Sequence, residues 1–162
     1  MKENRRSSSI LPVSHAIAST ATSLIIYWHF RSLPCALISW ITGFFLDIDH
    51  VVDYYANHDF TLSYKDIYRA SVETNYKKIY LVLHSDELVL AVWGCIVIFS
   101  PGIFWTSAAI GFTQHMLFDH ITNPVKQPLG YFLLYRIRKH FDTDSLVNKA
   151  ELEKRRMSLR FP

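Results

Sequence analysis

Residues 111–119 read Gly-Phe-Thr-Gln-His-Met-Leu-Phe-Asp and place His115 and Asp119 near the end of an otherwise apolar stretch. Residues four apart share one face of an α-helix, so this imidazole and this carboxylate lie one turn apart. An Asp at the centre of a membrane helix costs about 2.5–3.5 kcal/mol, unless it is paired or binds a metal ion. The stretch therefore indicates a helix of a membrane bundle that carries part of a metal site.

Four apolar stretches surround this motif, at residues 10–30, 33–45, 79–99 and 103–118. A full membrane span needs about 20 residues, so the first and third are long enough and the other two are short. The chain is 50% hydrophobic and 15% aromatic over 162 residues. We therefore expect an all-α fold: an integral membrane bundle of about four transmembrane helices in residues 1–124, followed by a C-terminal interfacial amphipathic helix and a basic tail in residues 125–162.

The distribution of basic residues predicts the orientation of this bundle. Short loops rich in Lys and Arg stay on the cytoplasmic side. Of the seventeen Lys and Arg residues, only Arg31 lies in a predicted external turn. Both termini and the loop at residues 51–78 should thus be cytoplasmic, and the turns at 31–34 and 100–102 external.

With that threading, ionisable residues from all four stretches fall on the same membrane face. Each lies within one or two turns of a helix end, which is about 5–10 Å, so the side chains can meet in a single layer. The candidate metal ligands are His15, Asp47, Asp49, His50, His84, His115 and Asp119. A single membrane histidine is also a common helix-helix hydrogen-bond partner, and that interpretation stays open for His15 taken alone.

Imidazole and carboxylate ligands without thiolate favour zinc, with manganese or iron as alternatives. Cys35 and Cys95 lack a paired spacing and are interpreted as buried hydrophobes. In the motif at residues 47–50, Asp47 and His50 share a helical face while Asp49 points elsewhere. The motif can therefore serve two ions, or one ion and the groups that orient its ligands.

The chain resembles a known family at these positions. Leu-Asp-Ile-Asp-His at 46–50, His-Ser at 84–85, the 111–119 motif and Thr-Asn-Pro at 122–124 are similar to the bacterial inner-membrane metal-dependent hydrolases. That family is similar in motif order to zinc-dependent phospholipase C. The chain departs from the family where a His-Arg-Gly motif would precede the third helix, so Glu87 or Asp86 is the candidate replacement for a missing ligand.

The resemblance implies a multi-pass protein of the bacterial inner membrane that hydrolyses a lipid ester or phosphoester at the cytoplasmic face, with one or two divalent ions. Glu87 is the expected general base, with Asp86 as its substitute. Two alternatives stay open: a di-iron membrane oxidoreductase, and a non-catalytic metal-binding or transport protein. The histidine boxes of membrane oxygenases do not occur in the sequence, and ligands gathered at one face do not suit a carrier.

Lipid is the expected partner in two places. A membrane lipid is the expected substrate, and anionic headgroups should bind the basic tail at residues 154–156. The tyrosine-rich loop at 51–78 is either a lid over the site or an ordinary interfacial loop. The net charge of +3 is small and no recognition motif accompanies it, which argues against nucleic-acid binding. The sequence does not indicate an oligomeric state.

Overall fold

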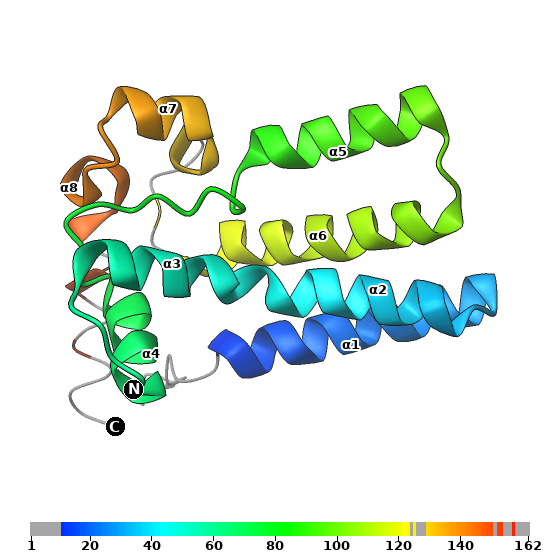
Figure 1. The fold of residues 1–162 in the computed structure, drawn as a ribbon, viewed down its shortest axis with the longest axis horizontal. Helices are drawn as coiled ribbons and strands as arrows, with labels where there is room; N and C mark the ends of the chain where they lie inside the picture. Colours follow the sequence, from blue (N-terminus) through cyan, green and yellow to red (C-terminus); the bar gives the residue numbers. More distant parts are fainter. Residues whose placement is uncertain (1–10, 124, 126–128, 151, 154–156, 158–162) are drawn as a thin grey trace, which may run out of the picture.

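The computed structural model describes residues 11–123, 125, 129–150, 152–153 and 157, which form an all-α structure without strands (Figure 1). The predicted all-α class is therefore confirmed. Four helices run side by side along the long axis of the molecule, and neighbours in sequence alternate in direction. They are α1 (Leu11–Phe30), α2 (Leu33–Phe44), α5 (Asp86–Phe99) and α6 (Ile103–Thr122).

Shorter elements gather at one end of these four helices, opposite the two tight turns (Figure 1). The helix α3 continues the line of α2 through a single 3-10 turn, while the others cross that end of the molecule. The elements are η2 (Phe45–Asp47), α3 (Ile48–Asn57), α4 (Tyr64–Glu73), η3 (Leu129–Tyr131), α7 (Leu133–Arg138) and α8 (Thr143–Leu146).

The core of the four-helix part is the contact of α2 with α1 and α6, and small residues make it close. Ser19, Ser39 and Ser107 are fully buried there. A Cβ atom added to Gly111 on α6 would lie 2.1 Å from the Ser39 carbonyl oxygen, so the two backbones touch at this glycine. Small residues that allow such close approach are typical of helix pairs in membranes.

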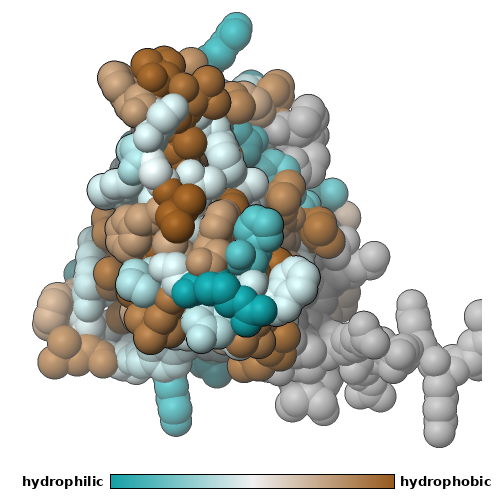
Figure 2. Space-filling view, turned by 90° about the vertical axis from the view of Figure 1, so that its right-hand side faces the viewer, coloured by the Kyte–Doolittle hydropathy of each residue, from teal (hydrophilic) through white to brown (hydrophobic). Residues whose placement is uncertain are grey.

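α5 stands apart from this core and has no buried residue. Its contact with α6 includes one hydrogen bond, from Trp93 Nε1 to Thr113 Oγ1 at 2.9 Å. Leu90, Val97 and Ile98 are each at least two-thirds exposed. Figure 2 looks onto the end that carries the two tight turns, where hydrophobic side chains reach the outer edge of the molecule and polar ones lie between them.

One helical stretch in the described part of the chain is long and apolar enough to cross a membrane. It is Leu33–Asn57, with 25 residues, in which an 18-residue window has a mean hydropathy of 1.5, and it combines α2, η2 and α3. A core helix of a soluble protein passes the same test, so this stretch does not establish a multi-pass protein. The four-span arrangement thus stays a proposal.

The third apolar stretch starts at residue 79, but its helix begins only at Asp86. Side chains from other elements take up the backbone groups of the preceding loop. Asp53 accepts hydrogen bonds from the amides of Tyr80 and Leu81, and Arg136 donates to the carbonyl oxygens of Tyr80, Leu81 and His84. Because these groups are satisfied without a helix, residues 80–85 remain non-helical.

The C-terminal segment also differs from the prediction. Instead of one interfacial helix in residues 125–162, the described part of this segment has the short η3, the six-residue α7 and the four-residue α8. Arg136 of α7 is 2% exposed and points inward, because the carbonyl oxygens of the loop before α5 are its hydrogen-bond partners. The basic tail at 154–156 lies outside the described residues.

Candidate metal centre

The predicted ligands come from five different parts of the fold and meet at the end of the bundle where α3 and α7 lie (Figure 1). α1 supplies one histidine, η2 and α3 supply the residues of the 47–50 motif, and the loop before α5 supplies another histidine. α6 supplies the imidazole and carboxylate of its i, i+4 pair. Three groups, each with ligand atoms within 4.8 Å of one another, are His15–Asp47–His115, Asp47–His50–His84 and His84–His115–Asp119.

His84 and His115 form the centre of this cluster, with their Nε2 atoms 3.2 Å apart. Oδ1 of Asp47 lies 3.6 Å from the first Nε2 and 3.4 Å from the second. Oδ2 of Asp119 lies 3.5 Å and 3.7 Å from the same two atoms. Two ligands of a tetrahedral zinc ion, each bonded at about 2.0–2.1 Å, lie about 3.3 Å apart. Both triangles of atoms therefore have the dimensions of a zinc coordination face.

The hydrogen bonds on the other side of the two rings determine what the Nε2 atoms offer. Nδ1 of His115 donates to the Gly43 carbonyl oxygen at 2.7 Å, which requires a proton on Nδ1. Nδ1 of His84 faces Oδ2 of Asp49 at 3.5 Å. With the proton of neutral His84 on Nδ1 as well, both Nε2 atoms carry lone pairs that point at each other. Only a cation or a proton between them makes this arrangement favourable, and carboxylate-oriented or carbonyl-oriented histidines are typical metal ligands.

Several buried polar atoms in the cluster lack a hydrogen-bond partner among the described residues. They include both carboxylate oxygens of Asp119, although His15 Nε2 lies 3.2 Å from Oδ1. Asp119 is 1% exposed. A buried carboxylate without hydrogen bonds is costly, and a bound cation would offset that cost. The donor set thus fits a divalent metal ion.

Asp49 contacts the His84 ring on the side away from the two Nε2 atoms. Its Oδ2 accepts a hydrogen bond from the Leu83 amide at 2.6 Å and faces Nδ1 of His84, not the Nε2 atoms. This is the orienting position that the 47–50 motif left open for one of its two carboxylates. His50 remains at the centre, with Nε2 3.7 Å from Oδ1 of Asp47.

The charge balance around His84 favours a cation at this position. Burial alone opposes a positive charge on the ring, but the carboxylates of Asp47 and Asp49 outweigh it and raise the pKa of His84 to about 9. The same carboxylates would favour a divalent cation at this position.

The structure does not bring Glu87 or Asp86 into the cluster. The carboxylate of Glu87 accepts hydrogen bonds from the amides of Leu133 and Leu134, at 2.7 and 3.0 Å, and so caps the start of α7. Oδ2 of Asp86 lies 3.3 Å from Nε2 of His120. Neither carboxylate is placed to replace a metal ligand or to activate water at the cluster, because both face the α6–α7 side instead.

A pocket of about 430 Å³ opens beside the cluster. His15, Asp47, His50 and Asp119 form part of its polar wall, and side chains of α2, η2, α3 and α4 together with Asn123 form the rest. Residues of α4 that line it are Tyr64, Ile67, Tyr68 and Ser71. The tyrosine-rich segment therefore does border the site, as the lid interpretation expects.

Three residues that orient the site are not among the ligands that the sequence predicts. Asp53 and Arg136 hold the loop that carries His84, and the Gly43 carbonyl oxygen orients His115. The spacing of Asp53, one turn after Asp49, was a usable signal. Nothing local in the sequence identifies an arginine 52 residues away as the partner of the His84 carbonyl oxygen.

No protein-family model, curated protein or solved structure matches the chain. The resemblance to the inner-membrane hydrolases therefore rests on the motif residues alone.

Proposed function

We propose that this protein is a metal-dependent hydrolase of the cytoplasmic membrane face, acting on a lipid ester or phosphoester. One observation carries the proposal. Two buried histidines direct their Nε2 atoms at one point, and the carboxylates of Asp47 and Asp119 complete coordination-sized triangles around it. This constellation borders an open pocket, which a purely structural metal site does not need.

The residues divide into ligands and orienting groups. His84, His115, Asp47 and Asp119 would hold the ion, and zinc suits this donor set better than magnesium or calcium. When bound, such an ion lowers the pKa of a water molecule toward neutrality and polarises the bond to be cleaved. His15, 3.2 Å from the second oxygen of Asp119, is placed to share a second ion with it.

His50 replaces Glu87 as the proposed general base. Its ring lines the pocket, and its Nε2 atom lies 3.7 Å from Oδ1 of Asp47. An imidazole in this position can take a proton from water and pass it to the leaving group. Asp47, whose side chain is 34% exposed, is the cluster carboxylate most open to the pocket.

The membrane location is supported by the distribution of apolar surface. α1 and α6 each have 20 residues, which corresponds to about 30 Å and to the thickness of the hydrocarbon core. α5 is apolar on all sides beyond its first turn and buries nothing. Apolar area of this extent on a monomer in water would be unusual. The cluster would then lie at the end that the basic residues assign to the cytoplasm.

Hydrolysis by the purified protein tests the proposal. Detergent-purified protein, loaded with zinc, is incubated with phospholipids, lipid phosphates and acyl esters, and the products are identified by mass spectrometry. We expect turnover of one class, lost on chelation and in His50→Ala, and retained in His29→Ala as a matched control outside the site. Metal binding without turnover of any class would favour the carrier alternative and contradict the hydrolase.

A further inference from the structure

We infer that the groove between α1 and α2 holds an acyl chain of the substrate while its ester or phosphate group lies at the metal centre. The inference rests on the proposed function and adds a substrate class, a lipid bound by one extended chain. It depends on a surface that the metal centre itself does not explain.

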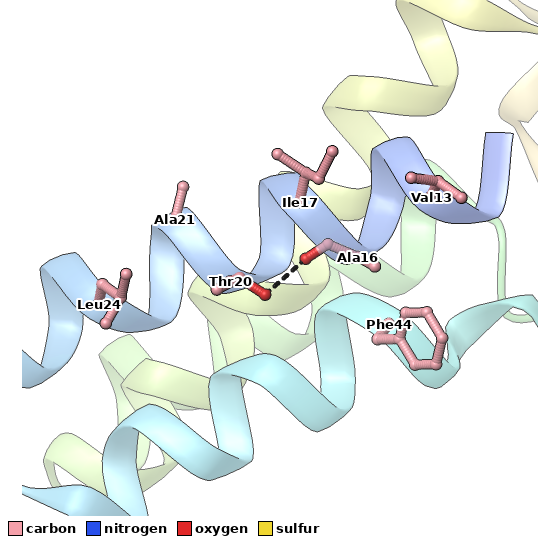
Figure 3. A pocket seen from close by; sticks show the side chains of 7 residues that line it. All are labelled: Val13, Ala16, Ile17, Thr20, Ala21, Leu24 and Phe44. Atoms are coloured by element: carbon pink, nitrogen blue, oxygen red, sulfur yellow. Dashed lines mark hydrogen bonds between the residues drawn. The ribbon is translucent and has the colours of Figure 1, made fainter. Parts of the chain in front are cut away.

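The groove begins next to the cluster. A hollow of about 600 Å³ runs along α1, lined by Val13, Ala16, Ile17, Thr20, Ala21 and Leu24, with Phe44 of α2 on the other side (Figure 3). Its one polar side chain, Thr20, is satisfied, because its hydroxyl donates to the Ala16 carbonyl oxygen at 2.7 Å and accepts from Trp40 Nε1. The lining thus offers an apolar ligand no unpaired polar side chain.

The groove shares lining residues with the pocket of the metal centre at one end and with a second hollow at the other. Phe44 lines both the groove and the pocket that contains His15 and Asp47. Thr20 and Leu24 line both the groove and the next hollow, of about 390 Å³, which extends to Tyr27 and Leu33. These shared residues place the two hollows in succession along α1, leading away from the cluster, and we call them together the channel.

The length of this channel suits an acyl chain. From Val13 to Tyr27 the rise along α1 is about 21 Å. One leaflet of the hydrocarbon core is about 15 Å deep, so an extended chain of a membrane lipid fits within the channel. α1 and α2 are two of the four proposed spans, and all four run along the long axis of the molecule. A chain in the groove would therefore run parallel to the lipid chains around it.

Photocrosslinking with acyl chains of two lengths tests the inference. Zinc-loaded protein in detergent micelles is mixed with lysophosphatidic acid that carries a diazirine at the end of either an octanoyl or a palmitoyl chain, and the crosslinked residues are mapped by mass spectrometry. If the phosphate end is held at the metal centre, the shorter chain should label residues near Thr20 and Ala21 and the longer chain residues near Tyr27 and Leu33.

A matched pair of variants adds specificity. Leu24→Trp places an indole in the channel, about 14 Å along α1 from His15. Leu90→Trp makes the same change on α5, where the leucine is 67% exposed, close to the 63% of Leu24. We expect Leu24→Trp to reduce palmitoyl labelling near Tyr27 at least fivefold and to leave octanoyl labelling unchanged, and Leu90→Trp to change neither.

Labelling spread equally over α1, α2 and α5, or labelling that does not move with chain length, would overturn the groove assignment. The result is independent of catalysis, because crosslinking needs no turnover. If labelling moves with chain length but no hydrolysis is detected, the proposed reaction is contradicted and the lipid site is supported. If hydrolysis is detected but the groove is not labelled, the lipid site is contradicted and the proposed reaction is supported.

Discussion

α5 and α6 form one hairpin, yet they are packed in opposite ways. α6 buries seven residues, including Gly111, His115 and Asp119, whereas α5 buries none. α5 is the more apolar of the two, so hydrophobicity does not decide burial in this hairpin. Five of the seven residues that α6 buries are small or ionisable, which is the pattern expected if the bundle lies in a membrane as we propose. The comparison separates a helix that holds the site in place from one that mainly faces outward.

The largest loss of stability is expected for a substitution of Arg136, which holds the loop before α5 in place. Arg136→Met would leave the carbonyl oxygens of Tyr80, Leu81 and His84 without their charged donor. Breaking a buried charged network of this kind costs about 3–5 kcal/mol in stability. We expect a large drop in the thermal midpoint and reduced zinc affinity, because His84 would lose its fixed position.

The exposed Arg138 on the same helix is the matched control. Arg138→Met should shift the thermal midpoint by little, since an exposed arginine contributes little to stability. Equal midpoints for the two variants would show that the loop does not depend on Arg136.

A smaller change in stability is expected when one glycine on each helix of the hairpin is replaced by alanine. In Gly111→Ala the new Cβ would lie 2.1 Å from a backbone oxygen of α2, and overpacking of this kind costs about 1–3 kcal/mol. In Gly94→Ala, on α5, the Cβ would meet nothing within 4 Å, so alanine should be neutral or stabilise by about 0.5–1 kcal/mol. Chemical unfolding in detergent measures both. A similar loss in both variants would mean that α5 is packed as tightly as α6.

The smallest effect concerns Glu87, at the start of α5. Because its carboxylate caps α7, Glu87→Gln should lower hydrolytic turnover by less than about tenfold, whereas loss of a general base costs about 10²–10⁴-fold. Steady-state turnover of the substrate class identified in the hydrolysis panel gives the answer. A loss of several hundredfold would restore Glu87 to the catalytic role that the sequence suggested.

Local spacing was enough to predict much of this fold and site. The i, i+4 pair of His115 and Asp119, and the clustering of ionisable residues at one end of each apolar stretch, correctly placed the cluster at one end of a helical bundle. These signals work because helical geometry converts spacing into a shared face. The sequence also left open an orienting role in the 47–50 motif, which Asp49 takes.

Contacts between distant segments account for what the sequence did not predict. α5 begins only at Asp86 because Asp53 and Arg136 satisfy the backbone groups that precede it. Glu87 caps α7, which lies next to it, and does not face the cluster. In each case a side chain meets backbone groups 27 to 56 residues away, and no periodicity reports such a pairing.

The metal content of the purified protein tests the central claim most directly. Parent, His115→Ala, Asp119→Asn and the control His29→Ala are purified without added chelator, and bound zinc, manganese and iron are measured by mass spectrometry per mole of protein. We predict one or two ions in the parent and in His29→Ala, and less than a tenth of that in the two cluster variants. Equal trace metal in all four proteins would contradict a metal centre built on His84, His115 and the two carboxylates.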